Sequence, residues 1–226
     1  MLDQIADNIY FILSRSFDSN IIYIKSGDRE ILVDAGTGMF TSNLDKDLQT
    51  KDSSIESITD IVLTHCHIDH IGGVIPLVEA GSPKLHLHEA EASRINSGDM
   101  SQTLGDTFGA DLPPFKIDVM LNEGDIIDFG DVKLRVFHTP GHSSGSITME
   151  ILETGILITG DTLFPGGSFG RTDFPDGNSR KLVESLKRIS EMDFEIGLPG
   201  HMNAMRFNAR HSALRSYEIA KNWFGV

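Results

Sequence analysis

Apolar residues recur along the chain with the two-residue period of strands in some segments and with the three-to-four-residue period of helices in others. The segment IIYIKSGDREILVDAG at 21–36 predicts a β-hairpin that returns to Asp34. The segment SITMEILETGILITGD at 146–161 predicts a second hairpin that ends at Asp161. Each hairpin ends in an aspartate next to a glycine, which hints at two related halves of the chain packed face to face.

Further strands are predicted where apolar runs end at polar residues. The run ITDIVLTH at 58–65 predicts a buried strand ending at His65, and FEIGLPGH at 194–201 predicts a last strand ending at His201. Helices are predicted where apolar residues recur every three or four positions. The remaining predicted strands cover 84–89 and 125–138, and the predicted helices cover 40–48, 70–81, 89–95, 180–192 and 210–224.

The segment NSGDMSQTLGDTFGADLPP at 96–114 is rich in glycine, serine and aspartate. A loop of this length within a compact domain is typically functional or mobile, so we predict a lid or access flap here. No linker rich in proline or serine divides the chain. We therefore predict a single domain over residues 1–226, built from sheets covered by helices.

The composition limits the partners of the chain. Its 226 residues are 39% hydrophobic and carry a formal net charge of −14. Such an acidic protein lacks the positive field that attracts nucleic acids and anionic membranes, so we expect neither as a partner. No apolar run approaches the roughly 20 residues of a membrane helix, and the first ten residues do not resemble a secretory signal. With Cys66 as the only cysteine, we expect a cytoplasmic protein, and the oligomeric state is left open.

The stretch TDIVLTHCHIDHIGG at 59–73 places His65, His67, Asp69 and His70 within six positions. Burying three imidazoles and a carboxylate without partners would be costly, whereas a divalent metal neutralises and fixes them. Surface histidines paired with acids would explain one of these residues, but not the whole cluster. Residues two apart on an extended segment project to the same side, so His65 and His67 can reach one ion.

Three more candidate ligands follow other apolar runs, and each borders a glycine. His142 lies in TPGHSSG, Asp161 in ITGDT and His201 in LPGHM. Each of them alone is ordinary loop material. Because the ends of neighbouring strands meet at one edge of a sheet, the three together become candidates for the same site.

In this order, THCHIDH, GH, GD and GH resemble the motifs of the metallo-β-lactamase-fold superfamily. The segments ILVDAG before the first motif and GRTDFP at 170–175 are similar to it as well. Within the superfamily, the chain resembles glyoxalase II and its short single-domain relatives. The resemblance implies an α/β (α+β) fold, a four-layer αββα sandwich of the metallo-β-lactamase type.

The resemblance also implies a ligand set for two divalent metal ions, with zinc expected and iron or manganese as alternatives. Asp161 would bridge the two ions, and Asp69 and Asp161 are also the candidate catalytic residues. No organic cofactor is expected. By motif, His65, His67 and His142 would hold one ion, and Asp69, His70 and His201 would hold the other.

Such a centre implies hydrolysis of a small-molecule substrate by metal-bound hydroxide, since the ions lower the pKa of water from about 15.7 to about 7. A thiolate, with a thiol pKa of about 8.5, leaves with little need for a general acid. The sequence shows no obvious spare acid, which favours a thioester or a lactone over a lactam. The resemblance to glyoxalase II implies a thioester of the hydroxyacylglutathione type. Only about 25 residues follow His201, which leaves glutathione specificity open, because full-length glyoxalase II has a helical C-terminal domain that contributes glutathione contacts.

Other activities of the superfamily remain as alternatives. The resemblance to persulfide dioxygenases is close, and these use a single iron at positions that match His65, His142 and Asp161. A metal-binding relative without enzymatic activity is the third reading. β-Lactamases of this fold generally lack the aspartate at Asp161, flavodiiron proteins carry an acid where His67 stands, and an RNA-processing enzyme would conflict with the net charge of −14.

Several polar residues outside the ligand set invite simpler explanations. Cys66 is expected to be a buried, inert thiol, and Arg171 and Asp173 are expected to pair and shape their loop. His86 and His88 alternate in KLHLH and are expected on a polar sheet face. Two residues could either support the site or serve their own turn or strand end, and these are Asp34 and His138.

Overall fold

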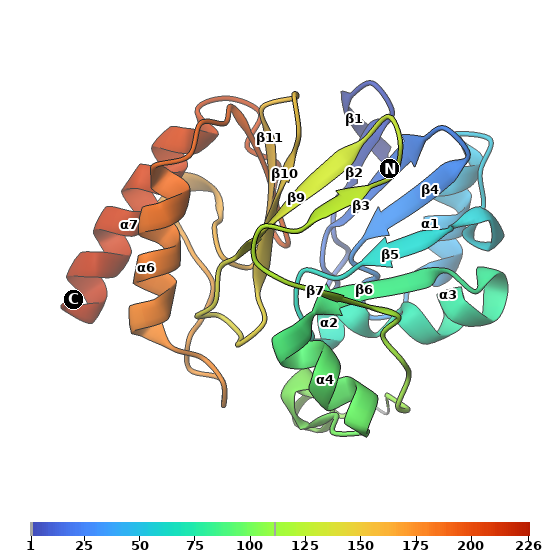
Figure 1. Ribbon diagram of the computed structural model, residues 1–226, viewed down its shortest axis with the longest axis horizontal. Coiled ribbons are helices and arrows are strands. Elements are labelled where there is room, and N and C mark those ends of the chain that lie inside the picture. The colour runs from blue at the N-terminus through green and yellow to red at the C-terminus, as the bar shows by residue number, and fades with distance from the viewer. Residues whose placement is uncertain (1, 111) are drawn as a thin grey trace. The chain divides into compact units, whose positions relative to one another are not determined.

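The computed structural model describes residues 2–110 and 112–226. The chain divides into two compact units, each with its own β-sheet (Figure 1). The first unit runs to Met120 and includes Phe129–Asp131, and the second comprises Leu121–Asp128 and Val132–Val226. The single domain predicted over residues 1–226 stays a prediction, as does the packing of two halves.

The first unit contains a seven-stranded sheet in which the strands follow one another in chain order. β1 to β4 pair antiparallel, whereas β5 and β6 continue the sheet in parallel. The strands are β1 Leu2–Ala6, β2 Ile9–Ile12, β3 Ile21–Ser26, β4 Arg29–Val33, β5 Asp60–Val62, β6 Lys84–His88 and β7 Val119–Leu121.

Helices of the first unit pack on its sheet through one apolar core. Leu44 from α1 and Leu77 from α3 join Leu32 and Ile61 from the strands in this core. Burying each such side chain contributes roughly 1.5–3 kcal/mol. The helical elements are α1 Thr41–Gln49, η1 Ile55–Ser57, α2 Ile68–Ile71, α3 Val74–Gly81, α4 Glu89–Ser97, η2 Ser101–Thr103 and α5 Gly105–Phe108.

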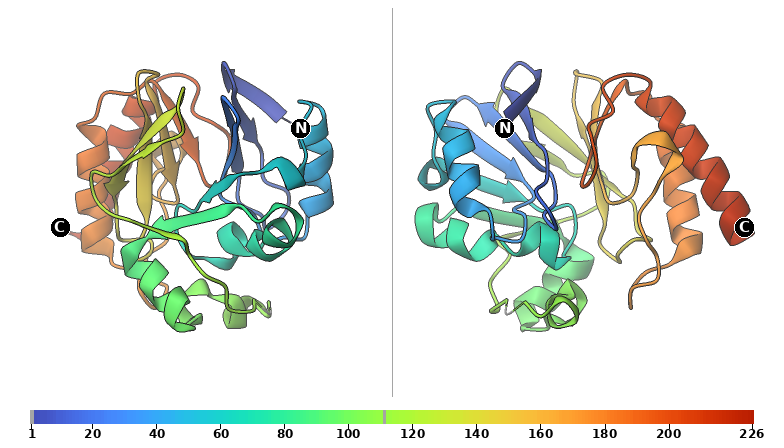
Figure 2. Two further views of the ribbon diagram at one scale, coloured as in Figure 1. Left: turned by 45° about the vertical axis from the view of Figure 1, so that its right-hand side comes forward. Right: turned by 180° about the vertical axis from the view of Figure 1, so that it is seen from behind.

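The second unit contains a five-stranded sheet in the order β12-β11-β10-β9-β8, covered on one face by two helices (Figure 2). Leu182 and Leu186 from one helix and Ala213 from the other pack together with Leu157 of the sheet. The elements are β8 Ile126–Asp128, β9 Lys133–His138, β10 Ile147–Ile151, β11 Ile156–Gly160, η3 Pro165–Gly167, α6 Ser179–Ser190, β12 Ile196–Pro199 and α7 Ala209–Phe224.

Both predicted hairpins are confirmed. β3 and β4 pair antiparallel with Ile22 opposite Val33, and β10 and β11 pair with Ile151 opposite Ile156. In each sheet the second strand of the hairpin is followed by a parallel neighbour, β5 beside β4 and β12 beside β11. Four of the five predicted helices are confirmed, whereas the one predicted over 70–81 is divided at Gly72 and Gly73 into α2 and α3. The side chain of Asn178 caps α6 by accepting from the backbone N–H of Lys181.

The structure differs from the sequence prediction at further places. β12 ends at Pro199 rather than at His201. β5 ends at Val62 rather than at His65, because the backbone N–H of Thr64 bonds the side chain of Asp34 instead of a neighbouring strand. The hairpin of β1 and β2 was not predicted. Within the segment 96–114, the chain forms η2 and α5, Asp111 lies outside the described residues, and the lid stays a prediction.

Candidate metal centre

Four predicted ligands lie together in the first unit, where the chain leaves β5 and enters α2. The side chains of His65, His67 and His70 are buried, and that of Asp69 is 24% exposed. Nε2 of His65 lies 3.1 Å from Nδ1 of His67, and Nε2 of His70 lies 3.8 Å from Oδ2 of Asp69. The rings of His65 and His70 are 4.1 Å apart between centroids. The extended segment and the following helical turn thus gather four ligand side chains within a few ångström.

Asp34 holds His70 in a defined tautomer. Its Oδ2 lies 2.8 Å from Nδ1 of His70 and accepts from the hydroxyl of Thr64 at 2.9 Å, while its Oδ1 accepts from the backbone N–H of Thr64 at 2.8 Å. A carboxylate only accepts hydrogen bonds, so Nδ1 of His70 carries the proton and Nε2 keeps its lone pair. Asp34 has a φ of 64° and is 1% exposed, and it therefore also forms the turn after β4. Both roles considered from the sequence are confirmed.

Glycines bring the turn after β4 against the start of α3. A Cβ on Gly73 would lie 2.0 Å from the carbonyl oxygen of Ala35, and one on Gly72 would lie 2.6 Å from that of Thr37. Backbone hydrogen bonds cross this contact, from Ala35 to the carbonyl of His70 at 2.8 Å. The two glycines permit this close packing, which fixes Asp34 relative to His70.

The other three predicted ligands lie together in the second unit, each beyond the end of a strand. Oδ2 of Asp161 lies 3.5 Å from Nε2 of His142 and 3.5 Å from Nε2 of His201. Asp161 follows β11 and His201 follows β12, and these strands run parallel, so their ends meet at the same sheet edge. His142 and Asp161 are buried, and His201 is 30% exposed. The carboxylate is therefore shared between two imidazoles.

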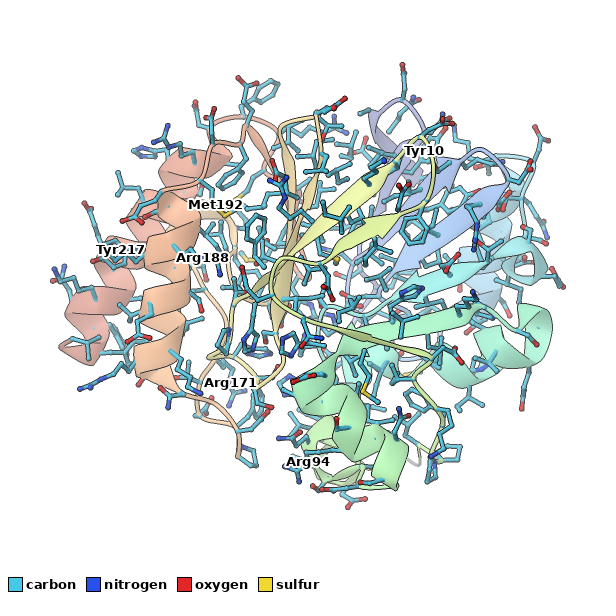
Figure 3. The ribbon with its side chains drawn as sticks, viewed as in Figure 1. Tyr10, Arg94, Arg171, Arg188, Met192 and Tyr217 are labelled. Atoms are coloured by element: carbon cyan, nitrogen blue, oxygen red, sulfur yellow. The ribbon has the colours of Figure 1, made fainter. Side chains whose placement is uncertain are left out.

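The loop GRTDF orients His142. Nδ1 of His142 donates to the backbone carbonyl of Arg171 at 2.7 Å, which leaves Nε2 free of its proton on the side of Asp161. Arg171 pairs with Asp173 through two bonds of 2.9 and 2.7 Å, as the sequence predicts, and holds the pKa of Asp173 below its usual range (Figure 3). The guanidinium also lies over the ring of Phe174, whose centroid is 5.8 Å from that of His142.

Gly170 allows this loop to pass close to the candidate ligands. A Cβ at this position would lie 1.9 Å from the carbonyl oxygen of Asp161 and 3.0 Å from Nδ1 of His142. We expect Gly170→Ala to lower zinc affinity at least about tenfold, because moving the loop breaks the His142 to Arg171 bond. Zinc titration of the metal-free protein measures this. The control Gly166→Ala meets no atom within 4 Å and carries only the strain of a φ of 75°, so unchanged zinc affinity in both variants would contradict the expectation.

Histidines outside the ligand set have structural roles. His86 and His88 were expected on a polar sheet face, and this was wrong, because both are buried. Nε2 of His86 lies 2.9 Å from Oδ1 of Asp60, and Nδ1 of His88 accepts from the backbone of Ala90 at the start of α4. Nε2 of His138 donates to the carbonyl of Ser144 at 2.9 Å, so it fastens the loop that carries His142. Cys66 is buried, as expected.

Two groups that support the ligands were not singled out from the sequence. The hydroxyl of Thr64 donates to Asp34 and lies 3.1 Å from Nδ1 of His65. The position of Thr64 directly before the histidine cluster could have indicated this role. The carbonyl of Arg171 has no side-chain signature, so no sequence pattern could have found it.

The donor set fits divalent metals such as zinc, for which imidazole nitrogen and carboxylate oxygen are favoured ligands. In the first unit, ligand atoms of His65 and His67, of His65 and His70, and of Asp69 and His70 lie within 4.8 Å of each other. The fixed tautomers of His70 and His142 meet a further requirement, since a ligating imidazole needs an unprotonated nitrogen.

Comparisons with known proteins agree with these observations. A family model described as the Metallo-beta-lactamase superfamily matches residues 15–201. The acyl-coenzyme A thioesterase MBLAC2 of Homo sapiens is 28% identical over 97% of this chain and 85% of its own length. The probable metallo-hydrolase MJ0888 of Methanocaldococcus jannaschii is 34% identical over 79% of this chain and 85% of its own length.

Solved structures are similar over most of the chain. TTHA1623 in a di-iron-bound form matches with a TM-score of 0.70 and 30% identity, over 86% of this chain and 92% of that one. A metallo-beta-lactamase of Cronobacter sakazakii matches with a TM-score of 0.78 and 17% identity, over 99% of this chain and 92% of that one. The predicted fold class, an α/β (α+β) sandwich of the metallo-β-lactamase type, is confirmed. Among the described residues, no helix is both long enough and apolar enough to span a membrane.

Proposed function

Because the chain belongs to the metallo-beta-lactamase superfamily and resembles a probable metallo-hydrolase, we propose that it is a thioester hydrolase with a dinuclear metal centre. Asp161 is the bridging residue in this proposal. The ions are zinc in this proposal, and iron is the alternative, since TTHA1623 binds two irons. The proposed ligands are His65, His67, Asp69, His70, His142, Asp161 and His201.

The observation that carries the proposal is the pair of fixed tautomers. Nδ1 of His70 is held by a carboxylate and Nδ1 of His142 by a backbone carbonyl, so both imidazoles keep a lone pair on Nε2. Histidines that only pack in a core do not need their Nδ1 atoms held by an acceptor so that Nε2 keeps its lone pair. Bonds of this kind hold ligating imidazoles in place and raise their basicity.

The bound ions would supply a hydroxide nucleophile at neutral pH and a Lewis acid for the carbonyl oxygen. Asp69 and Asp161 would contribute negative charge, and with it the capacity to hold a proton near the reacting atoms. A thioester suits this set of residues, because its thiolate leaves with little help from a general acid. MBLAC2 is named an acyl-coenzyme A thioesterase, which supports the same bond type. Hydroxyacylglutathione remains the specific substrate class that we propose.

The test combines metal analysis with assays on anaerobically purified full-length protein. We expect about two zinc ions per chain and hydrolysis of glutathione or coenzyme A thioesters. His67→Ala should remove most of this activity, whereas His211→Ala, an exposed residue of α7, should leave it unchanged. Full metal loading without thioester hydrolysis would contradict the proposal.

The same samples test the persulfide dioxygenase alternative. That activity needs a single iron, held by His65, His142 and Asp161 in this chain. It predicts about one iron per chain, oxygen uptake that depends on a persulfide, and only a small loss in His67→Ala. His142→Ala should abolish either activity and therefore serves as the negative control for both assays.

A further inference from the structure

Two exposed phenylalanines, far apart in the sequence, meet in the first unit. Phe17 is 68% exposed and Phe108 is 47% exposed, and their ring centroids lie 6.0 Å apart at an angle of 59°. A tilted aromatic contact is favourable, but both side chains remain exposed to water. Exposed apolar surface of this kind, held in a fixed arrangement, is typical of a ligand-binding rim.

The loop that carries Phe17 is fastened to the ligand segment. The backbone N–H of Ser19 donates to the carbonyl of Asp69 at 3.0 Å. Oδ1 of the buried Asp18 accepts from the hydroxyl of Thr37 at 2.6 Å. Burial raises the pKa of Asp18, and the hydrogen bonds from Thr37 oppose that rise. Phe17 is therefore two residues from a direct bond to a proposed metal ligand.

The segment that carries Phe108 is fastened to the same stretch of chain. The thiol of Cys66, which stands between His65 and His67, donates to the carbonyl of Gln102 at 3.6 Å. Earlier in the segment, Arg94 of α4 bonds Asp99 at 2.9 Å through Nε (Figure 3). The two phenylalanines thus approach each other from segments that are both hydrogen-bonded to the stretch 66–69, which carries proposed ligands.

We infer that Phe17 and Phe108 form an acyl subsite, a rim that binds the apolar acyl group of the thioester substrate. This inference rests on the proposed thioesterase function and extends its substrates from short hydroxyacyl groups to longer aliphatic acyl groups. The surroundings disfavour an anionic thiol carrier at this place. Asp106 is exposed on α5 beside Phe108, and Arg15 in the Phe17 loop is paired with Asp47 at 3.4 Å. An uncharged, apolar chain therefore suits the rim better than glutathione or coenzyme A does.

Affinity should consequently rise with the length of the acyl chain. Each fully buried methylene contributes about a fourfold gain in affinity. A rim covers each methylene only in part, so we expect a gain of about tenfold to a hundredfold between acetyl and octanoyl groups.

The test uses the zinc-loaded full chain with acetyl and octanoyl thioesters of glutathione and of coenzyme A. Calorimetric binding of the non-hydrolysable thioethers S-methylglutathione and S-octylglutathione supplies a readout independent of turnover. Phe17→Ala and Phe108→Ala should each lower kcat/KM for the octanoyl esters about tenfold through KM, and acetyl esters at most about twofold. Trp223→Ala, which removes a 79% exposed aromatic ring of α7, is the matched control.

Equal losses for both chain lengths, a fall in metal content, or no change in either variant would overturn the acyl subsite. If the protein hydrolyses thioesters without regard to chain length, the subsite fails and the proposed function stands. If it hydrolyses no thioester, but binds S-octylglutathione through both phenylalanines, the proposed function fails and the subsite stands.

Discussion

Replacing Asp161 with asparagine should lower thioester hydrolysis by about three orders of magnitude and reduce bound zinc from about two ions to about one per chain. Oδ2 of Asp161 lies 3.5 Å from Nε2 of both His142 and His201, so the two imidazoles of the second unit share this carboxylate. Asparagine keeps the shape but loses the negative charge, and a neutral amide is a poor ligand for zinc. Metal analysis and the hydrolysis assay measure the two effects.

The matched control for this prediction is Asp128→Asn. Its carboxylate lies in the same unit and pairs with Lys133 at 2.8 Å on the surface, where an exposed ion pair contributes little to stability. Zinc content and hydrolysis should stay at the level of the unchanged protein. A variant at Asp161 that retained two zinc ions and full activity would show that this residue does not bridge the metals.

Local patterns in the sequence predicted most of what lies on one continuous stretch of chain. The cluster from His65 to His70 is such a stretch, because an extended segment followed by a helical turn fixes where its side chains point. The hairpins before Asp34 and Asp161 are another case, since alternation and a turn signal specify the pairing of adjacent strands. Local spacing therefore indicated that the side chains from His65 to His70 lie together, whereas His142, Asp161 and His201 were grouped by their positions after strands and by the family resemblance.

Groups that depend on contacts between distant segments were not predictable in the same way. The backbone carbonyl that orients His142 carries no sequence signature. His86 is buried because Asp60, on the neighbouring strand, accepts its hydrogen bond, and period-two alternation cannot distinguish such a buried pair from a polar surface. The strand β1, LDQIA, has too few apolar residues to stand out before its partner β2 is known.

Replacing Asp34 with asparagine should lower zinc affinity about tenfold to a hundredfold while leaving the stability of the metal-free protein nearly unchanged. Asparagine tolerates the φ of 64° at this position. Its oxygen must accept from the backbone N–H of Thr64, which cannot turn round, so its amide group faces Nδ1 of His70. The imidazole then switches tautomer, and the proton moves to Nε2, the atom needed for the metal. Competition with a chelator measures the affinity, and excess zinc should restore hydrolysis.

Two further variants separate this tautomer effect from general damage at the turn. Asp34→Ala removes three hydrogen bonds at once and leaves buried donors without an acceptor, so it should cost about 1–3 kcal/mol of stability for each stranded group. Asp28→Asn, in the exposed turn of the same hairpin, should change neither zinc affinity nor stability. The contrary results are a loss of stability in Asp34→Asn as large as that in Asp34→Ala, or a failure of excess zinc to restore its activity. Either result would show that Asp34 stabilises the turn after β4 and does not fix the tautomer of His70.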